Sequence, residues 1–187
     1  MLKRSYNVYG RFFCAGFSFA EDRHMLKKIL FAVILIVSFG AVAVSSAGQP
    51  EMTDVKLYFV DAGMMRLVPI RTTLYKTDKA HEAKAVLNAL IAGRDNNPKI
   101  RRLIPDIKKC MTVRVRENTA YVNITQKMID AHPDGRDAEM LTVYQIVNSL
   151  TCIDGIANVK FTINGSTQKE FMGYLDMRET FIPDYLI

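Results

Sequence analysis

Hydrophobic and polar positions along this chain follow two periods, and the change from one period to the other marks the elements that we predict. Residues 137–165 give the clearest case, because apolar residues recur every three positions over 141–150 and every two positions over 159–163. The first period predicts a helix with Asp137 as its N-cap, and the second predicts a half-buried strand followed by an Asn164-Gly165 turn. We expect the rest of the chain to cover this helix–strand unit.

The other segments continue these two patterns. Alternation predicts extended segments at residues 55–60, 67–75, 111–117, 120–124 and 171–176. A further helix is predicted over 78–92, where Asp78 is a good N-cap and Gly93 stops the pattern. Pro69 indicates that its strand lies at a sheet edge or is bulged, since proline cannot donate a backbone hydrogen bond. We expect a loop rich in helix breakers at 129–136.

The order of these elements defines the predicted fold class. Two helices separate pairs of strands within a domain that we assign to residues 55–187. This order predicts an α+β two-layer sandwich, in which two helices cover one face of a mixed or antiparallel sheet. It also suggests a duplicated βαββ unit. The apolar residues at 181–187 predict a tail that packs on the body of the domain.

The N-terminal region carries the strongest signal for location. Met25 begins a short basic stretch, the 16 residues at 29–44 are almost wholly apolar, and small residues come next. This layout is typical of a secretory signal peptide, and the apolar run is shorter than the roughly 20 residues of a membrane-spanning helix. We predict a signal peptide or uncleaved membrane anchor at 25–47 and a linker at 48–54. Residues 1–24 are interpreted as an extension that precedes the true start of translation.

The basic charge of the chain needs to be located before it is interpreted. The formal net charge is +6, but residues 48–187 hold 19 basic and 17 acidic residues, so most of the excess belongs to the N-terminal region. Nucleic-acid binding is therefore not indicated. Seven basic residues do fall close together in the domain: Lys99, Arg101, Arg102, Lys108, Lys109, Arg114 and Arg116. This clustering predicts a positively charged surface patch that binds an acidic partner, and the alternative is an ordinary solvated surface.

Candidate chemistry is sparse elsewhere. Cys110 and Cys152 are a candidate disulfide in an exported protein, with two small buried apolar residues as the alternative. No cysteine follows the apolar run to receive a lipid. His81 and His132 stand alone and are expected at the surface, and no metal or cofactor motif occurs.

Several polar side chains are open to more than one interpretation. The carboxylates that could serve a hydrolase are Asp106, Asp134 and Asp137, and they are scattered along the sequence. The asparagines that invite a ligand-binding interpretation are Asn123, Asn148 and Asn164. We expect the asparagines to serve turns and bridges within the fold.

Short motifs in this order resemble the GerMN domain, the sporulation and spore germination domain of bacterial envelope proteins. The matching segments are Leu67-Val68-Pro69-Ile70, residues 85–90 with Ala92-Gly93, Ile104-Pro105, residues 120–123, residues 145–151, residues 159–165 and residues 173–176. Three features depart from the family pattern: Arg94 follows Gly93 where proline is common, Asp106 replaces a glycine, and the lipidation cysteine is missing.

The resemblance covers about two thirds of the chain and implies an extracytoplasmic, non-catalytic domain without cofactors. The function that we expect is an interaction module that binds an envelope protein or a cell-wall polymer, with no nucleic-acid partner. Membrane contact would come only through the N-terminal segment if that segment is not cleaved. A cell-wall hydrolase that uses the loop carboxylates is the alternative, and it requires those groups to converge in one cleft.

Overall fold

The computed structural model describes Lys27 and residues 50–94, 96–167 and 171–187. The fold below concerns the compact unit Gly48–Ile187. The predicted extension and the signal peptide or anchor lie outside the described residues, apart from Lys27. Among the residues that are described, no helix has both the length and the apolar character needed to cross a bilayer.

The first sheet, sheet A, is built around a long antiparallel hairpin. Strand β1 (Met52–Asp61) pairs with β2 (Leu67–Tyr75) on one side and with β3 (Ile100–Arg101) on the other. Because Met52 pairs with Tyr75, β1 begins inside the segment that we predicted as a linker. Strand β2 lies at the sheet edge, which confirms the interpretation of Pro69.

The second sheet, sheet B, is mixed. Strands β4 (Met111–Arg116) and β5 (Thr119–Ile124) form the predicted antiparallel hairpin, and β6 (Asn158–Ile163) pairs with β5 in parallel. The predicted α+β class is therefore confirmed, whereas the single sheet is replaced by two three-stranded sheets.

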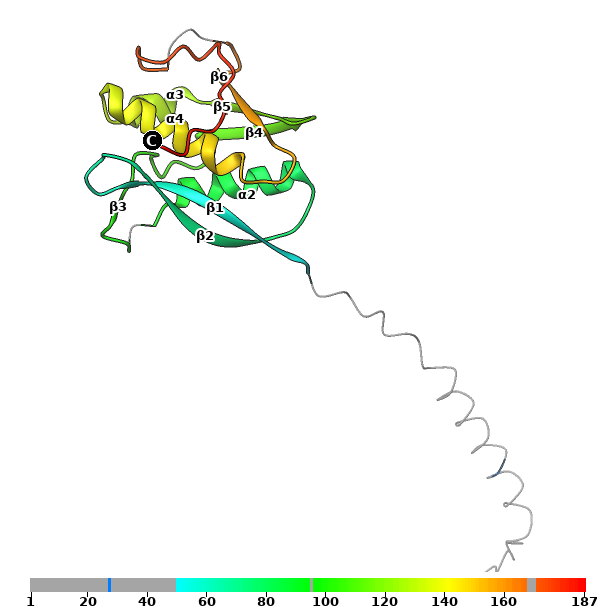
Figure 1. Ribbon diagram of the computed structural model, residues 1–187. Helices are drawn as coiled ribbons and strands as arrows, with labels where there is room; N and C mark the ends of the chain where they lie inside the picture. Colours follow the sequence, from blue (N-terminus) through cyan, green and yellow to red (C-terminus); the bar gives the residue numbers. More distant parts are fainter. Residues whose placement is uncertain (1–26, 28–49, 95, 168–170) are drawn as a thin grey trace, which may run out of the picture. The chain divides into compact units, whose positions relative to one another are not determined.

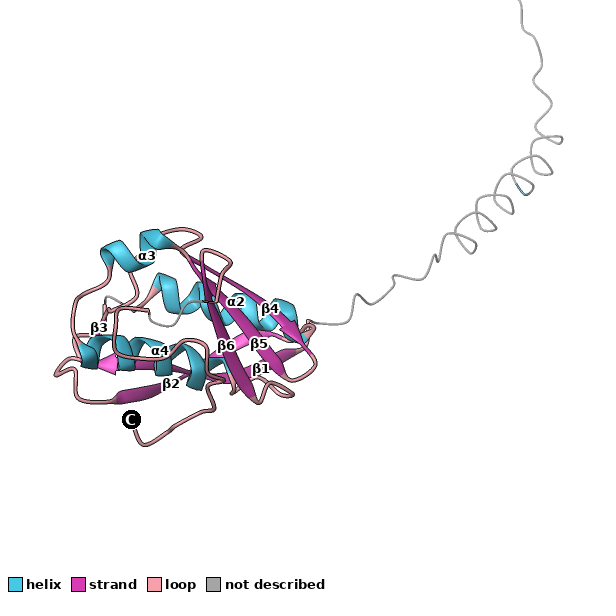
Figure 2. Cartoon of the chain, turned by 90° about the horizontal axis from the view of Figure 1, so that it is seen from above, coloured by secondary structure: helices cyan, strands magenta, loops and turns pink. Residues whose placement is uncertain are grey.

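The two long helices lie between the two sheets instead of on one face of a single sheet (Figures 1 and 2). Helix α2 (Lys79–Ala92) begins at Asp78, whose carboxylate accepts the backbone N–H groups of Ala80 and His81, and it ends at Gly93, as predicted. The N–H of His81 holds the pKa of the Asp78 carboxyl below its usual value.

The second long helix, α4 (Arg136–Leu150), is buried on nearly all sides, with 11 of its 15 residues inaccessible. It begins at Gly135, so the prediction that Asp137 caps it is wrong and Asp137 lies in its first turn. A helix on the outer face of a single sheet would leave one side in water. Because nearly all sides of α4 are buried, this helix needs protein neighbours above and below it.

Several buried polar side chains on α4 are hydrogen-bonded inside the protein. Ser149 Oγ accepts the backbone N–H of Tyr58 at 2.8 Å and donates to the carbonyl of Gln145 at 2.7 Å. Strand β1 has only a short partner at that edge, because β3 pairs only with Val60 and Asp61. The helix hydroxyl therefore satisfies a strand N–H that no other strand reaches.

The predicted last strand at residues 171–176 does not form. The buried carboxylate of Glu139 instead accepts the backbone N–H groups of Tyr174 at 3.2 Å and Leu175 at 3.0 Å, which holds this segment in a series of bends. The suggested duplication of a βαββ unit is not found. Two copies of one unit would place the strand after each helix in the same direction, but β3 is antiparallel to β1 whereas β6 is parallel to β5.

The C-terminal tail packs on the domain, as predicted. Phe181 exchanges two backbone hydrogen bonds of 2.8 Å with Val159, and Tyr185 stacks on Tyr58 with ring centroids 5.6 Å apart. Fully buried Asn148 accepts the N–H of Asp184 at 3.0 Å and donates to its carbonyl at 2.6 Å. This confirms that Asn148 is a structural bridge.

We expect Asn148→Ala to lower the free energy of unfolding by about 2–3 kcal/mol, because both backbone groups of Asp184 lose a buried partner. Urea unfolding measures this loss, and limited proteolysis should release the last residues first. Asn88→Ala, at an exposed position of α2, is the control and should change stability by less than about 0.5 kcal/mol. An equal effect of the two substitutions would contradict the bridge.

His132 is buried, so the prediction that it lies at the surface is wrong, whereas exposed His81 follows expectation. A short helix that we predicted partly as loop, α3 (Gln126–Ala131), buries Met128 and ends at His132. The His132 ring makes hydrogen bonds of 2.8 Å with the Pro133 carbonyl and 2.7 Å with Thr142 Oγ1. Because a carbonyl can only accept, Nδ1 carries the proton in the neutral ring.

Burial lowers the pKa of His132, because the charged imidazolium loses its hydration. The unfolded chain then binds more protons than the folded chain as the pH falls below about 6.5, so stability should decrease there. Urea unfolding between pH 5 and pH 8 tests this. His132→Gln should be less stable but lose this part of the pH dependence, whereas His81→Gln should keep it. An unchanged slope in His132→Gln would refute the assignment.

Candidate functional site

The seven basic residues of the predicted patch are distributed over three parts of the fold. Lys99 and Arg101 lie in and beside β3, at the edge of sheet A. Arg102 turns inward, where Nη1 donates to the Ile91 carbonyl at 2.8 Å and Nη2 donates to the Ala92 carbonyl at 2.6 Å. Its guanidinium therefore satisfies the C-terminal end of α2 and serves the fold.

Lys108 and Lys109 line a hollow of about 370 Å³ beside the end of α2. Asp106 and Asn88 share this hollow, and Asp106 lies 4.0 Å from Arg102 Nη1. The positive charge here is therefore partly balanced by a carboxylate. Asp106 is the one carboxylate among the described residues that line this hollow.

Arg114 and Arg116 lie on the outer face of sheet B, which we define by the outward-pointing residues of its three strands. These are Thr112, Arg114, Arg116, Thr119, Tyr121, Asn123, Asn158, Lys160 and Thr162. Residues between them, such as Val122 and Phe161, point inward and are buried in the core. The alternation of each strand therefore separates a packed face from an accessible face.

The pairing register places a central row of three residues across the outer face of sheet B. Arg114 pairs with Tyr121, and Tyr121 pairs with Lys160. Tyr121 is 39% exposed and stands between two cations. Neighbouring rows put Arg116 on one side of this row and Asn123 on the other.

A hollow of about 390 Å³ opens on the outer face of sheet B beside Asn123. Asn123 Oδ1 accepts the Thr162 hydroxyl at 3.0 Å and the Gly165 N–H at 2.6 Å. These two bonds fix the amide, so its Nδ2 remains the available donor. They also tie the Asn164-Gly165 turn to β5.

The outer face of sheet B carries three cations and none of its own residues is acidic. Arg114, Arg116 and Lys160 make no ion pair with any other residue that the structure describes. Glu117, in the turn that follows β4, is the nearest acidic residue in sequence. The outer face of sheet B therefore presents a local excess of positive charge that suits an acidic partner.

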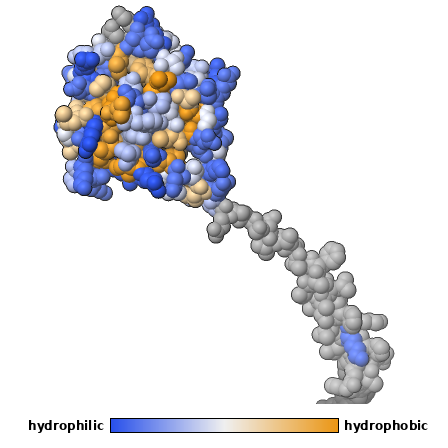
Figure 3. All heavy atoms as spheres, in the orientation of Figure 1, coloured by the Kyte–Doolittle hydropathy of each residue, from blue (hydrophilic) through white to orange (hydrophobic). Residues whose placement is uncertain are grey.

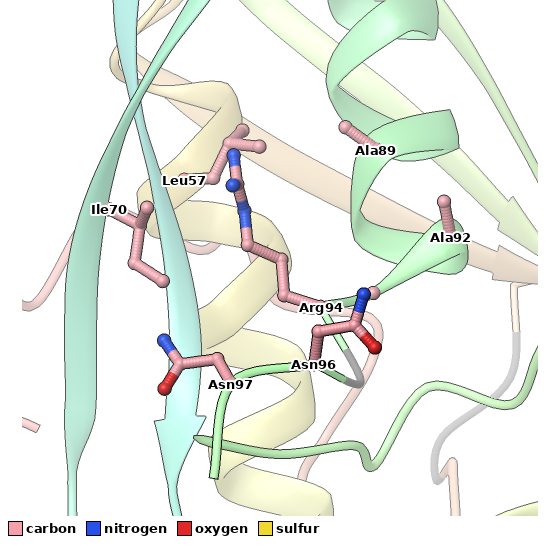
Figure 4. A pocket seen from close by; sticks show the side chains of 8 residues that line it. Leu57, Ile70, Ala89, Ala92, Arg94, Asn96 and Asn97 are labelled. Atoms are coloured by element: carbon pink, nitrogen blue, oxygen red, sulfur yellow. The ribbon is translucent and has the colours of Figure 1, made fainter. Parts of the chain in front are cut away.

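A larger hollow, of about 650 Å³, lies between sheet A and the end of α2 (Figure 4). Its walls are mainly apolar, with Leu57 and Ile70 from the strands and Ala89 from the helix. Figure 4 shows the Arg94 side chain extending between these walls, and Arg94 Nη2 donates to Thr72 Oγ1 at 2.9 Å. Arg94, the one cation among the described residues that line this hollow, is thus already held by the protein.

Cys110 and Cys152 are free thiols, so the candidate disulfide between them does not form in this structure. Cys110 is buried in the main core cluster beneath sheet B, whereas Cys152 packs against a second cluster around Tyr58 and Leu141. The two thiols belong to different parts of the core. Burial raises the pKa of both, which keeps them protonated and apolar in character.

The carboxylates of the hydrolase alternative belong to separate elements. Asp106 lies in the connection before β4, exposed Asp134 lies in the loop before α4, and Asp137 lies in the first turn of that helix. Asp106 faces lysines across its hollow. An acid–base pair needs two such groups directed at one substrate.

Sequence reasoning found two of the cations on the outer face of sheet B but missed Lys160 and Tyr121. Lys160 lies between Val159 and Phe161, which are buried, so the alternation in the sequence alone predicts that Lys160 points outward. The parallel pairing of β5 with β6, which brings Lys160 beside Tyr121, had no signal in the sequence.

We expect Arg102→Met to lower the free energy of unfolding by about 1.5–3 kcal/mol, because two carbonyls at the end of α2 lose a charged donor. Arg114→Met should change it by less than about 0.5 kcal/mol, because its side chain is exposed. Urea unfolding of both variants separates a structural arginine from one available for binding. Equal losses would contradict this division.

The arrangement of two sheets around a helical layer is the fold of the GerMN domain. The first GerMN domain of the sporulation protein GerM from Bacillus subtilis is 20% identical, with a TM-score of 0.52, and the match covers 72% of this chain and 99% of that one. A structure of both GerMN domains of GerM is 22% identical, with a TM-score of 0.54, covering 69% of this chain and 45% of that longer one. A candidate lipoprotein from Clostridium perfringens is 17% identical, with a TM-score of 0.51, covering 73% and 91%.

The family itself is established by sequence. A family model described as Germane, sporulation and spore germination, matches residues 56–169. The chain therefore belongs to the Germane family, which confirms the resemblance drawn from its motifs. No curated protein matches the chain significantly.

Proposed function

We propose that this protein is a non-catalytic interaction module of the cell envelope, within an assembly related to sporulation or germination. It works outside the cytoplasm and binds an acidic partner, a cell-wall polymer or an envelope protein, through the outer face of sheet B. The observation that carries this proposal is the group of three cations on that accessible face, Arg114, Arg116 and Lys160, which surround Tyr121 and make no ion pair with any other described residue.

Two further points support the location and the type of function. The apolar segment predicted at residues 25–47 is typical of an exported or anchored protein, and the similar protein from Clostridium perfringens is described as a candidate lipoprotein. The scattered positions of Asp106, Asp134 and Asp137 favour binding over hydrolysis, since acid–base catalysis needs convergent groups.

The test is co-sedimentation of the full-length protein, in mild detergent, with isolated cell walls and with envelope extract. A triple variant, Arg114→Glu, Arg116→Glu and Lys160→Glu, should bind at least tenfold more weakly, because attraction to an acidic partner becomes repulsion.

The control variant reverses three exposed cations outside sheet B, in the turn after β1, on β2 and on α2: Arg66→Glu, Arg71→Glu and Lys84→Glu. It has the same net charge as the first variant and should bind within about threefold of the natural protein. Equal losses in both variants would mean that only net charge matters, and no loss in the first would refute the proposed face. Release of soluble wall fragments by the natural protein would refute the non-catalytic assignment.

A further inference from the structure

The outer face of sheet B combines separated cations, an exposed aromatic ring and a fixed amide, and this combination narrows the chemistry of its partner. We infer that the partner is a phosphodiester-linked polyol or sugar polymer of the cell wall, which lies across the three strands of sheet B. This inference rests on the proposed function, because it names the acidic partner of the same face.

The spacing of the cations fits a polymer with isolated charges. Arg114 and Arg116 are two residues apart on β4, which corresponds to about 7 Å, and Lys160 lies two strands away from Arg114, about 10 Å. A phosphodiester chain carries one negative charge per repeat, with uncharged polyol between the charges. Arginine also matches phosphate geometry through its planar fork of N–H donors.

Tyr121 occupies the position where uncharged polyol would lie. It stands in the central row between Arg114 and Lys160, and the residue is 39% exposed. An aromatic ring offers a flat apolar surface with a hydroxyl at its edge, which suits the carbon chain and the hydroxyl groups of a polyol. The row therefore alternates cation, ring and cation, as the polymer alternates phosphate, polyol and phosphate.

The hollow beside this row supplies directed hydrogen bonds. Asn123 is held by Thr162 and Gly165 through its Oδ1 atom, so its Nδ2 group can donate to a hydroxyl or phosphate oxygen. The Thr162 hydroxyl gives its hydrogen to Asn123 and so presents lone pairs that accept. Both groups are oriented before any ligand arrives, which reduces the entropy cost of binding.

A membrane or a protein partner fits the outer face of sheet B less well. Tyr121 is its one large exposed hydrophobic residue among those described, whereas membrane insertion and the centres of protein interfaces use apolar surface. Large exposed apolar residues lie elsewhere, at Met65 after β1 and at Ile182 and Leu186 of the C-terminal segment. Figure 3 shows one face of the domain, on which apolar residues gather in several places among polar ones. Apart from Tyr121, the residues that define the outer face of sheet B are polar or charged.

Synthetic poly(glycerol phosphate) of defined length is the probe, with uncharged polyglycerol and poly-glutamate as comparison polymers. The full-length protein in mild detergent should bind poly(glycerol phosphate) at least tenfold more tightly than either comparison polymer. Its affinity should fall as salt is raised, because the phosphate contacts are electrostatic. Binding of poly-glutamate with equal affinity would overturn the inference. The proposed function would then stand with an acidic protein as the partner of the outer face of sheet B.

Two single variants test the assigned roles. Tyr121→Ala should weaken binding at least fivefold with the salt dependence unchanged, whereas Lys160→Gln should reduce the salt dependence. Tyr75→Ala, at a tyrosine that is 65% exposed on β2, is the matched control and should bind normally. Unfolding midpoints confirm that the variants are folded. Unchanged binding by Tyr121→Ala would overturn the stacking role, and retained binding by the triple variant described above would refute the face itself.

Discussion

The structure depends on the burial of helix α4 among neighbours on every side. A helix in that position cannot leave its polar side chains to water, so each of them needs a partner within the protein. These side chains accept hydrogen bonds from backbone N–H groups: Ser149 from the edge of β1, Asn148 from the C-terminal tail, and Glu139 from the segment after β6. These contacts fix parts of the chain that have little regular structure of their own. Gln145 is the exception on this helix, since its Oε1 is buried without a hydrogen-bond partner among the described residues.

The same helical layer determines which surface remains for binding. Helix α2 contacts β4, and α4 contacts β6, so the inner face of sheet B is committed to the core. The tail pairs with β6 through Phe181 and does not cover the outward residues. Three strands therefore present alternate side chains to solvent as a regular array, in which the spacing of Arg114, Tyr121 and Lys160 follows from backbone geometry alone.

Much of the fold could be predicted from local pattern, and the failures have a common cause. The strand at Leu67–Tyr75 and the helix that begins after Asp78 follow from alternation and capping, which are properties of neighbouring residues. The division into two sheets depends on pairings between distant strands. The polar residues of α4, such as Thr142 and Asn148, look like a solvent face until their partners are known. Lys160 and Tyr121 on the outer face of sheet B were missed for the same reason, since a long-range pairing brings them together.

The parallel pairing of β5 with β6 has a consequence for the order in which the outer face of sheet B is completed during folding. Tyr121 and Lys160 are paired although 39 positions separate them, and both α3 and α4 lie in the intervening segment. Such a contact closes late, because the crossover must pack before its two ends can meet. Before β6 pairs, β4 and β5 present Arg114, Arg116 and Tyr121 without Lys160 beside them. The complete array of cations and ring therefore forms only when the domain has finished folding, so it is a property of the mature domain alone.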